Sequence, residues 1–188
     1  MFKKMTILIC ASILVATVHG WAGEKASQEI VDMANSELVQ VGEDPVIVAA
    51  VKKSNARRMS LADIKKHDDK WKKSAGISDF MKPILESACA KHLRSIQNSK
   101  SYIDEAFVMN NKGANVAMTD KTSDFWQGDE AKFKKSFNGG KGGVFIDDVE
   151  FDDSAQAYLV QVSVPVKDEG KVIGAITFGI NVDKFEQK

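Results

Sequence analysis

The chain has 188 residues, of which 44% are hydrophobic and 28% charged, and its 26 basic side chains equal its 26 acidic ones. This composition is typical of a globular protein long enough to form one domain with its own core, and it excludes a disordered or low-complexity chain. The balanced charge offers no basic excess for nucleic acid or anionic lipid, so neither is expected as a partner.

The first 22 residues have the layout of a secretory signal. A short cationic start, MFKK, is followed by the uncharged apolar run MTILICASILVATV and by small residues at Gly20 and Ala22. The apolar run is short for a membrane span. We therefore expect a cleaved signal peptide over residues 1–22, export to the periplasm, and a single mature domain over residues 23–188. An uncleaved N-terminal membrane anchor is the alternative.

No metal or cofactor is expected. Cys89 is the one cysteine outside the predicted signal, so the mature chain cannot form an internal disulfide or attach haem through two cysteines. Cys89 and His92 stand one helical turn apart, but zinc requires three or four protein ligands. The acidic run DDVEFDD lacks the glycine and terminal glutamate spacing of an EF-hand loop.

Helical periodicity dominates residues 26–98 and predicts four helices. Their expected starts are Ala26, Asp44, Ser60 and Ser78. Pro45 follows the Asp44 cap at the first helical position, and Gly76 is the expected end of the third helix. That third helix contains His67 within KKHDDKWKK, which we interpret as a charged, solvent-facing surface.

From residue 102 to 183 the apolar pattern changes to alternation, which predicts five antiparallel strands. Turn signals occur at NNKG and KDEG. The expected fold class is α+β, with long N-terminal helices packed on a central five-stranded antiparallel sheet.

The last two strands have two different faces. On the fourth strand, Val160, Val162 and Val164 share the face expected to pack on the helices, and Gln161 and Ser163 lie on the other. On the fifth strand, Val172, Ile176, Phe178 and Ile180 share the first face, and Ile173, Ala175, Thr177 and Asn181 share the second. The second face mixes apolar and polar side chains, so it requires a cover with hydrogen-bonding partners.

Residues 120–141, hereafter the lid segment, are the expected cover, because this polar, glycine-rich stretch also contains Phe125, Trp126, Phe133 and Phe137. A shallow ligand pocket is expected between lid and sheet. Its expected contacts are Trp126, Asp124, Phe133, Lys141, Phe145, Asp147, Tyr158, Gln161, Ser163 and Thr177. Four of these residues also have a purely structural interpretation. Trp126 can anchor a loop, Asp124 and Asp147 can cap turns, and Lys141 can be a solvated surface side chain.

Three stretches and Trp71 resemble the extracytoplasmic Cache sensor domains, which have a PAS-like fold and occur on bacterial chemoreceptors and sensor kinases. The stretches are EDPVIVAAVKKSNA, AFVMNNKGANVAMTDKTSDFWQGDEAKF and VSVPVKDEGKVIGAITFGINVDKF. The resemblance implies a small carboxylate or amino acid bound between the sheet and the loop after its first hairpin. The region before the third strand lacks the arginine of amino-acid-binding members, so an organic acid is the preferred ligand.

The sequence is consistent with two functions. The first is a periplasmic sensor module that binds a small organic acid, has no output domain of its own, and signals through a membrane receptor or sensor kinase. The second is a ligand-free interaction module, in which Trp126 and the long helices contact a partner protein. The chain is expected to be a monomer or a weak homodimer through its N-terminal helices. No catalytic triad or pair of catalytic carboxylates is recognisable, so an enzyme is not expected.

Overall fold

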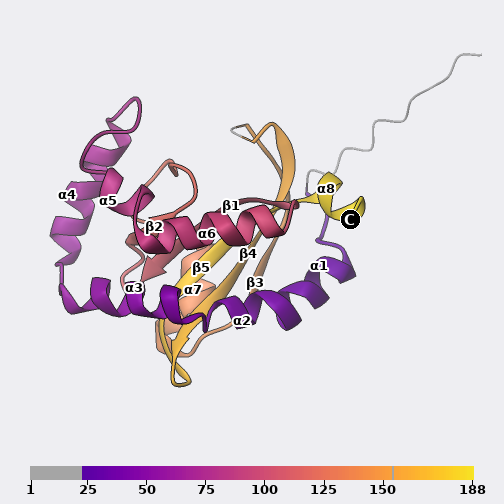
Figure 1. Ribbon diagram of the computed structural model, residues 1–188, viewed down its shortest axis with the longest axis horizontal. Coiled ribbons are helices and arrows are strands. Elements are labelled where there is room, and N and C mark those ends of the chain that lie inside the picture. The colour runs from indigo at the N-terminus through magenta and orange to yellow at the C-terminus, as the bar shows by residue number, and fades with distance from the viewer. Residues whose placement is uncertain (1–22, 154) are drawn as a thin grey trace, which may run out of the picture.

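The computed structural model describes residues 23–153 and 155–188, so the predicted signal peptide lies outside the described residues. Helices come first along the chain, and the sheet follows (Figure 1). The helical elements before the sheet are α1 (Gln28–Met33), the π-helical turn η1 (Ala34–Leu38), α2 (Val39–Val41), α3 (Pro45–Ala56), α4 (Leu61–Lys72), α5 (Lys82–Leu85) and α6 (Ala88–Ser99). The remaining elements are β1 (Ile103–Asn110), β2 (Asn115–Met118), α7 (Ala131–Phe137), the 3-10 turn η2 (Asn138–Gly140), β3 (Phe145–Asp152), β4 (Ala157–Asp168), β5 (Lys171–Asn181) and α8 (Val182–Glu186).

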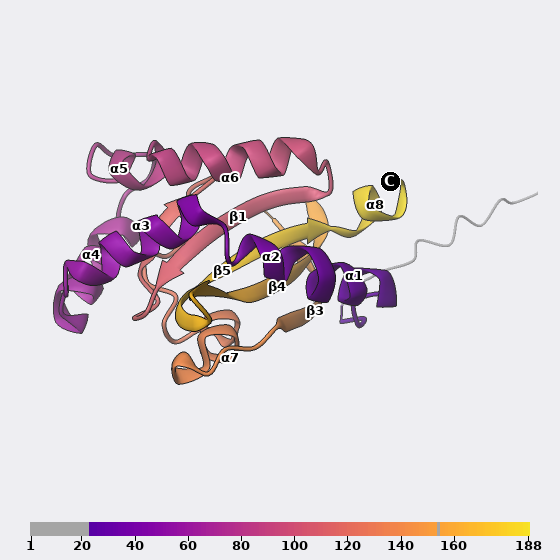
Figure 2. The ribbon, with the colours of Figure 1, turned by 60° about the horizontal axis from the view of Figure 1, so that its bottom comes forward.

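The five strands form one antiparallel sheet in the order β2-β1-β5-β4-β3. Helices α3 and α6 lie on one face of the sheet, and α7 lies on the other (Figure 2). The α+β architecture predicted from the sequence, long helices on a five-stranded antiparallel sheet, is confirmed.

Capping residues set the starts of the helices. The Asp44 carboxylate accepts hydrogen bonds from the backbone N–H groups of Val46 and Ile47, at 2.8 and 3.3 Å, and Pro45 occupies the first turn of α3. Ser60 caps α4 by accepting from the backbone N–H of Asp63. Both predicted helix starts are confirmed.

The predicted fourth helix is wrong as a single element. It consists of the short helix α5 and, after a break at Glu86, the longer helix α6. The Ser87 hydroxyl accepts from the backbone N–H of Ala90 at 3.0 Å and starts α6, whereas the expected cap, Ser78, begins no helix. The third helix, α4, ends at Lys72, before Gly76. The break matters because it sets α5 at the end of the molecule where α3 and α4 meet (Figure 1).

The main core lies between the sheet and helices α1, α3 and α6. Val160, Val162 and Val164 of β4 are fully buried there, as predicted. The expected faces at the start of β5 are wrong: Ile173 packs against this main core, whereas Val172 lies beside Gly142 of the opposite face. The pairing of β4 with β5 is irregular between Val166 and Lys167, and a register shift reverses the faces beyond it.

Among residues 23–153 and 155–188, no helix combines the length and apolar character needed to cross a membrane. Within the same residues, no group of three or more His, Cys, Asp or Glu side chains is placed to hold a metal ion.

Candidate functional site

The lid segment covers the second face of the sheet with a packed aromatic cluster. Phe107, Met109 and Ala175 of the sheet belong to one buried cluster with Phe125 and Phe133 of the lid, and the rings of Phe133 and Phe137 stack at 5.2 Å. At the centre of this face, Ser163 and Thr177 are fully buried and their hydroxyl groups hydrogen bond to each other at 2.8 Å. These two hydroxyl groups therefore find their partners within the protein.

A small cavity remains at one edge of the covered face, between the start of α7 and strands β3 and β4. This acidic cleft has a volume of about 190 Å³. Two of the predicted site residues, Asp147 and Gln161, line it together with Glu130, Asp148, Glu150 and Asp152. Lys132 also lines the cleft, but its ammonium donates to the Gln161 side-chain oxygen at 2.9 Å. A surface with this excess of carboxylates repels an organic anion.

Glu105 lies behind the acidic cleft and has a perturbed pKa. Its side chain crosses Gly179 of β5, where a Cβ atom would lie 2.6 Å from the Glu105 Cγ atom, and it accepts a long hydrogen bond from Gln161. Burial raises the pKa of Glu105 above its ordinary value of 4.5, and repulsion by Asp152 adds to this effect while Lys132 opposes it.

Replacing Glu105 with glutamine is expected to stabilise the fold at neutral pH. Because the folded-state pKa is raised, the folded protein holds more protons than the unfolded chain between pH 4.5 and that pKa, and wild-type stability falls as the pH rises across this window. The E105Q variant should therefore melt higher than wild type at about pH 7.5 and equally at about pH 4. Thermal unfolding monitored by circular dichroism measures this, with Glu150→Gln on exposed β3 as control; a pH-independent difference would contradict it.

The remaining predicted site residues do not converge on one cavity. The Trp126 indole N–H donates to the backbone oxygen of Lys112 at 2.8 Å, and the Lys65 ammonium lies 4.8 Å from its ring. Asp124 lies 3.6 Å from Lys72. Phe145 is buried beneath Lys135, Tyr158 packs edge-on against Phe151, and Lys141 is exposed. Of the ten residues, the structure brings Asp147 and Gln161 together in the acidic cleft.

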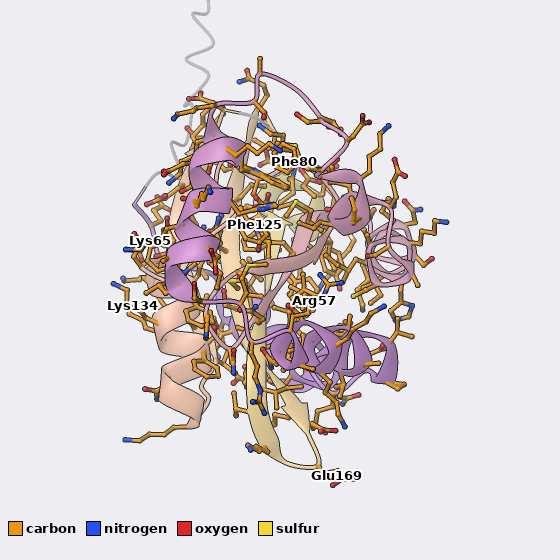
Figure 3. The ribbon with its side chains drawn as sticks, turned by 90° about the vertical axis from the view of Figure 1, so that its left-hand side faces the viewer. Arg57, Lys65, Phe80, Phe125, Lys134 and Glu169 are labelled. Carbon is orange, nitrogen blue, oxygen red and sulfur yellow. The ribbon has the colours of Figure 1, made fainter. Side chains whose placement is uncertain are left out.

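A larger cavity lies on the helical side, at the end of the molecule formed by α3, α4, α5 and the β1–β2 hairpin. This cavity, hereafter the α3 groove, has a volume of about 740 Å³. Its lining is mostly apolar, and one wall is a stripe along α3. The stripe consists of Pro45, Val46, Ala49, Ala50, Lys53 and Ser54, and Arg57 continues it beyond the helix. Phe80, Phe125 and Arg57 border the groove in Figure 3.

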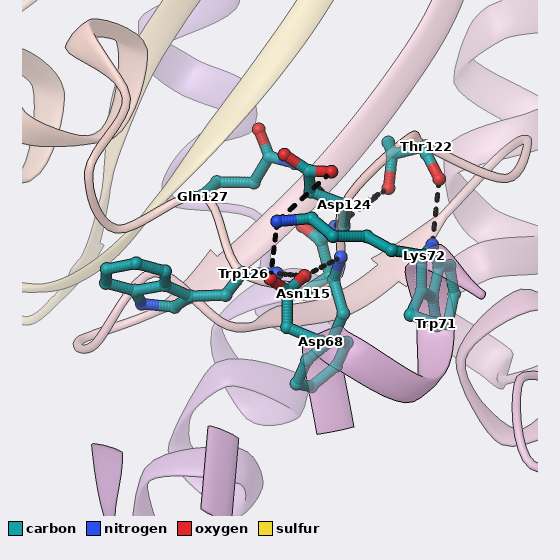
Figure 4. Close-up of polar contacts among 9 residues, drawn as sticks. Asp68, Trp71, Lys72, Asn115, Thr122, Asp124, Trp126 and Gln127 are labelled. Atoms are coloured by element: carbon teal, nitrogen blue, oxygen red, sulfur yellow. Dashed lines mark hydrogen bonds and ion pairs between the residues drawn. The ribbon is translucent and has the colours of Figure 1, made fainter. Parts of the chain in front are cut away.

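His67 and Asn115 both line the α3 groove, and each has one buried polar atom, Nε2 and Oδ1 respectively, with no hydrogen-bond partner among the described residues. Asn115 is 4% exposed, and its amide nitrogen donates to the Thr122 hydroxyl and to the Asp124 backbone oxygen, each at 3.1 Å. These bonds, drawn in Figure 4, leave the amide oxygen unpaired. Unpaired buried polar atoms cost free energy, so a cavity that contains two of them is suited to a ligand that supplies their partners.

The surroundings of His67 favour its neutral form. Its ring lies 4.5 Å from the ring of Phe125 and 5.2 Å from that of Phe80, centroid to centroid. Burial lowers the pKa of His67 from its ordinary value of 6.5, and nearby Lys70 lowers it further. The neutral imidazole can donate or accept one hydrogen bond through Nε2, depending on its tautomer.

The buried carboxylate of Asp68 positions the part of the lid that walls the groove. Its Oδ1 atom accepts from the backbone N–H groups of Phe125 and Trp126 at 2.8 and 3.0 Å, and its Oδ2 atom pairs with Lys72 at 2.8 Å (Figure 4). The interpretation of KKHDDKWKK as a solvent-facing surface is therefore wrong for His67 and Asp68, because Asp68 is 4% exposed and both side chains contact the lid. A buried aspartate within a lysine-rich run carries no sequence signal that separates it from the exposed aspartate beside it.

The α3 groove was not predicted from the sequence. The one available signal was the placement of small residues, Ala49 and Ala50, beside Lys53 on α3, which leaves space where larger side chains would fill it. Cys89 also lines the groove, and burial raises the pKa of its thiol to about 12, so it behaves as an apolar wall.

No protein-family model and no curated relative matches this sequence. Among solved structures, the sensor domain of the Vibrio cholerae histidine kinase DctB is 11% identical, with a TM-score of 0.42, and the alignment covers 85% of this chain and 56% of that one. The sensory domain of the Campylobacter jejuni chemoreceptor Tlp3 with isoleucine bound is 12% identical, with a TM-score of 0.41, covering 85% of this chain and 62% of that one.

The extracellular domain of the putative histidine kinase rpHK1S-Z16 is 15% identical, with a TM-score of 0.43, and 85% of this chain aligns with 60% of that one. This chain thus spans about three fifths of the length of the sensor domains it matches. These neighbours belong to the class that the sequence resembles, the sensor domains of receptors and histidine kinases.

Proposed function

We propose that this protein is a sensor module that binds a small organic acid in the α3 groove. The observation that carries the proposal is a mostly apolar cavity of about 740 Å³ whose lining residues His67 and Asn115 each have an unpartnered polar atom. Such a combination of apolar walls and few polar groups is the usual composition of a small-ligand site.

An anionic ligand fits the charges of the groove. Lys53 and Arg57 are exposed at its rim, and neither makes an ion pair with another described residue. The lining includes no Asp or Glu among the residues described, in contrast to the acidic cleft. The organic acid predicted from the sequence is therefore retained as the ligand class, and its proposed location moves from the lid to the groove.

Binding is proposed in preference to catalysis because the nucleophile types that line the groove are not activated. The Cys89 thiol, with a pKa of about 12, is protonated at neutral pH. The Ser87 hydroxyl caps α6, and the Ser54 hydroxyl accepts a hydrogen bond from the Asn110 side chain at 3.2 Å. Export to the periplasm and signalling through a membrane receptor or sensor kinase are part of the same proposal and rest on the N-terminal sequence and on the resemblance.

A ligand screen tests the proposal. Organic acids, amino acids and neutral analogues are added to the purified protein, and the melting temperature is followed as a function of ligand concentration. A ligand that binds the native state raises the melting temperature progressively, by a free energy that grows with the logarithm of its concentration. At least one acid is expected to do so. An unchanged melting temperature across the panel would contradict the proposal and favour an interaction module instead.

A further inference from the structure

The α3 groove is elongated and its two ends differ in chemistry. This difference specifies the ligand more closely than the class of organic acids. Resting on the function proposed above, we propose that the groove binds a medium-chain hydroxy fatty acid, with its carboxylate at the Lys53–Arg57 end and its acyl chain along α3 toward Pro45 and Cys89.

The shape of the groove favours a linear ligand. Its α3 wall extends from Pro45 to Arg57, and a helix of 12 residues is about 18 Å long. On the opposite side the wall passes from Phe80 through Ile84 to Ala88 and Cys89. His92 of α6 bonds to Asp44 at the N-terminal end of α3, so α6 runs back along α3 and keeps the groove elongated.

The two ends of the groove differ in chemistry. At the start of α3 the lining is Pro45, Val46 and Ala49, opposite Ala88 and the protonated thiol of Cys89. This end offers an apolar surface to a hydrocarbon chain. At the other end, the side chains of Lys53 and Arg57 supply two positive charges for a carboxylate.

The unpaired amide oxygen of Asn115 is a hydrogen-bond acceptor, so a ligand that carries a hydrogen-bond donor would satisfy it. It accepts no hydrogen bond from any described residue, and its amide nitrogen is already committed to the lid segment. A carboxylate has no proton to give it at neutral pH, whereas a hydroxyl group near the carboxylate does. The neutral His67 imidazole can provide the second partner of the same head group through Nε2.

Four ligands test the contributions of the hydroxyl group, the carboxylate and the acyl chain one at a time. They are 3-hydroxydecanoate, decanoate, decanol and 3-hydroxybutyrate. By calorimetry, 3-hydroxydecanoate is expected to bind tightest, with decanoate about tenfold weaker because Asn115 stays unpaired. Affinity should rise about fourfold for each methylene added from hexanoate to dodecanoate until the groove is filled. Decanol, which lacks the charge, and 3-hydroxybutyrate, which lacks the chain, should bind weakly.

Matched variants locate the head group. The double variant Lys53→Gln, Arg57→Gln should weaken 3-hydroxydecanoate binding and leave decanol binding unchanged, since both side chains are exposed and not needed for folding. Lys141→Gln, on the exposed turn after α7, should change neither. Equal binding of decanol and 3-hydroxydecanoate by the wild-type protein would overturn the head-group assignment.

The outcomes also separate this inference from the function proposed above. Binding of short organic acids with no gain from a longer chain overturns the acyl ligand and leaves the sensor function standing. Failure of every acid, short or long, contradicts both. A dimer in solution that Ala49→Trp converts to a monomer would show that a second copy of the chain occupies the groove, which overturns the proposal.

Discussion

Replacing Ala49 with tryptophan is expected to abolish ligand binding to the α3 groove while leaving the fold intact. Ala49 is an exposed helical residue whose methyl group lines the middle of the groove. An indole at this position would occupy the volume assigned to the acyl chain, so affinity for 3-hydroxydecanoate should fall about a hundredfold or more. The helix-propensity cost of the change is only about 0.5 kcal/mol, so the melting temperature should change little.

Calorimetric titration with 3-hydroxydecanoate measures the effect, and Ala62→Trp is the control. Ala62 is an exposed alanine of the neighbouring helix α4 and does not line the groove. The control variant should bind like wild type. If A49W keeps wild-type affinity, the ligand binds outside the α3 groove, and the proposed site is wrong.

Asp68→Ala is expected to cause the largest loss of stability. The substitution leaves the backbone N–H groups of Phe125 and Trp126 without their acceptor. Hydrogen bonds to a charged group contribute about 1.5–3 kcal/mol each, so the loss should be about 3 kcal/mol or more. The ion pair with Lys72 adds little, because the Lys72 side chain is half-exposed. The melting temperature should fall by about 6–12 °C.

Chemical denaturation measures the free energy of unfolding, and two variants complete the experiment. Asp69→Ala changes an exposed aspartate of the same helix and should have almost no effect. Asp68→Asn keeps one acceptor oxygen and should fall between wild type and D68A. A wild-type stability for D68A would mean that the lid is held by its aromatic packing and that Asp68 contributes nothing to it.

The D68A variant also connects the lid to the groove. Phe125, which receives one of the two Asp68 hydrogen bonds, lines the groove beside His67. Loosening the lid should therefore weaken ligand binding in addition to lowering stability.

Most of the fold could be predicted because its signals are local. Asp44 with Pro45 sets the start of α3, and Ser60 with Asp63 sets that of α4, through hydrogen bonds between residues two or three positions apart. The valines at every second position of β4 predicted its buried face correctly. The prediction became wrong where a single contact overrides periodicity, as at the Ser87 cap that separates α5 from α6 and at the register shift after Val166.

The cover over the sheet was also predictable in part, since aromatic residues in a polar stretch require a surface to pack on. The aromatic residues of the lid segment did not indicate how completely Phe133 and its neighbours fill the second face of the sheet. Side-chain volume and the mutual hydrogen bond of Ser163 and Thr177 decide this, and both depend on residues distant in the chain.

The starts of α3 and α4, the buried face of β4 and the need for a lid follow from the order of residues along the chain, because capping and side-chain alternation act over a few neighbours. The α3 groove instead needs α3, α5, α6 and the first hairpin to meet with small side chains between them, and the two unpaired atoms come from positions 67 and 115. Their lack of partners is a property of burial and geometry in three dimensions, which no spacing in the sequence encodes.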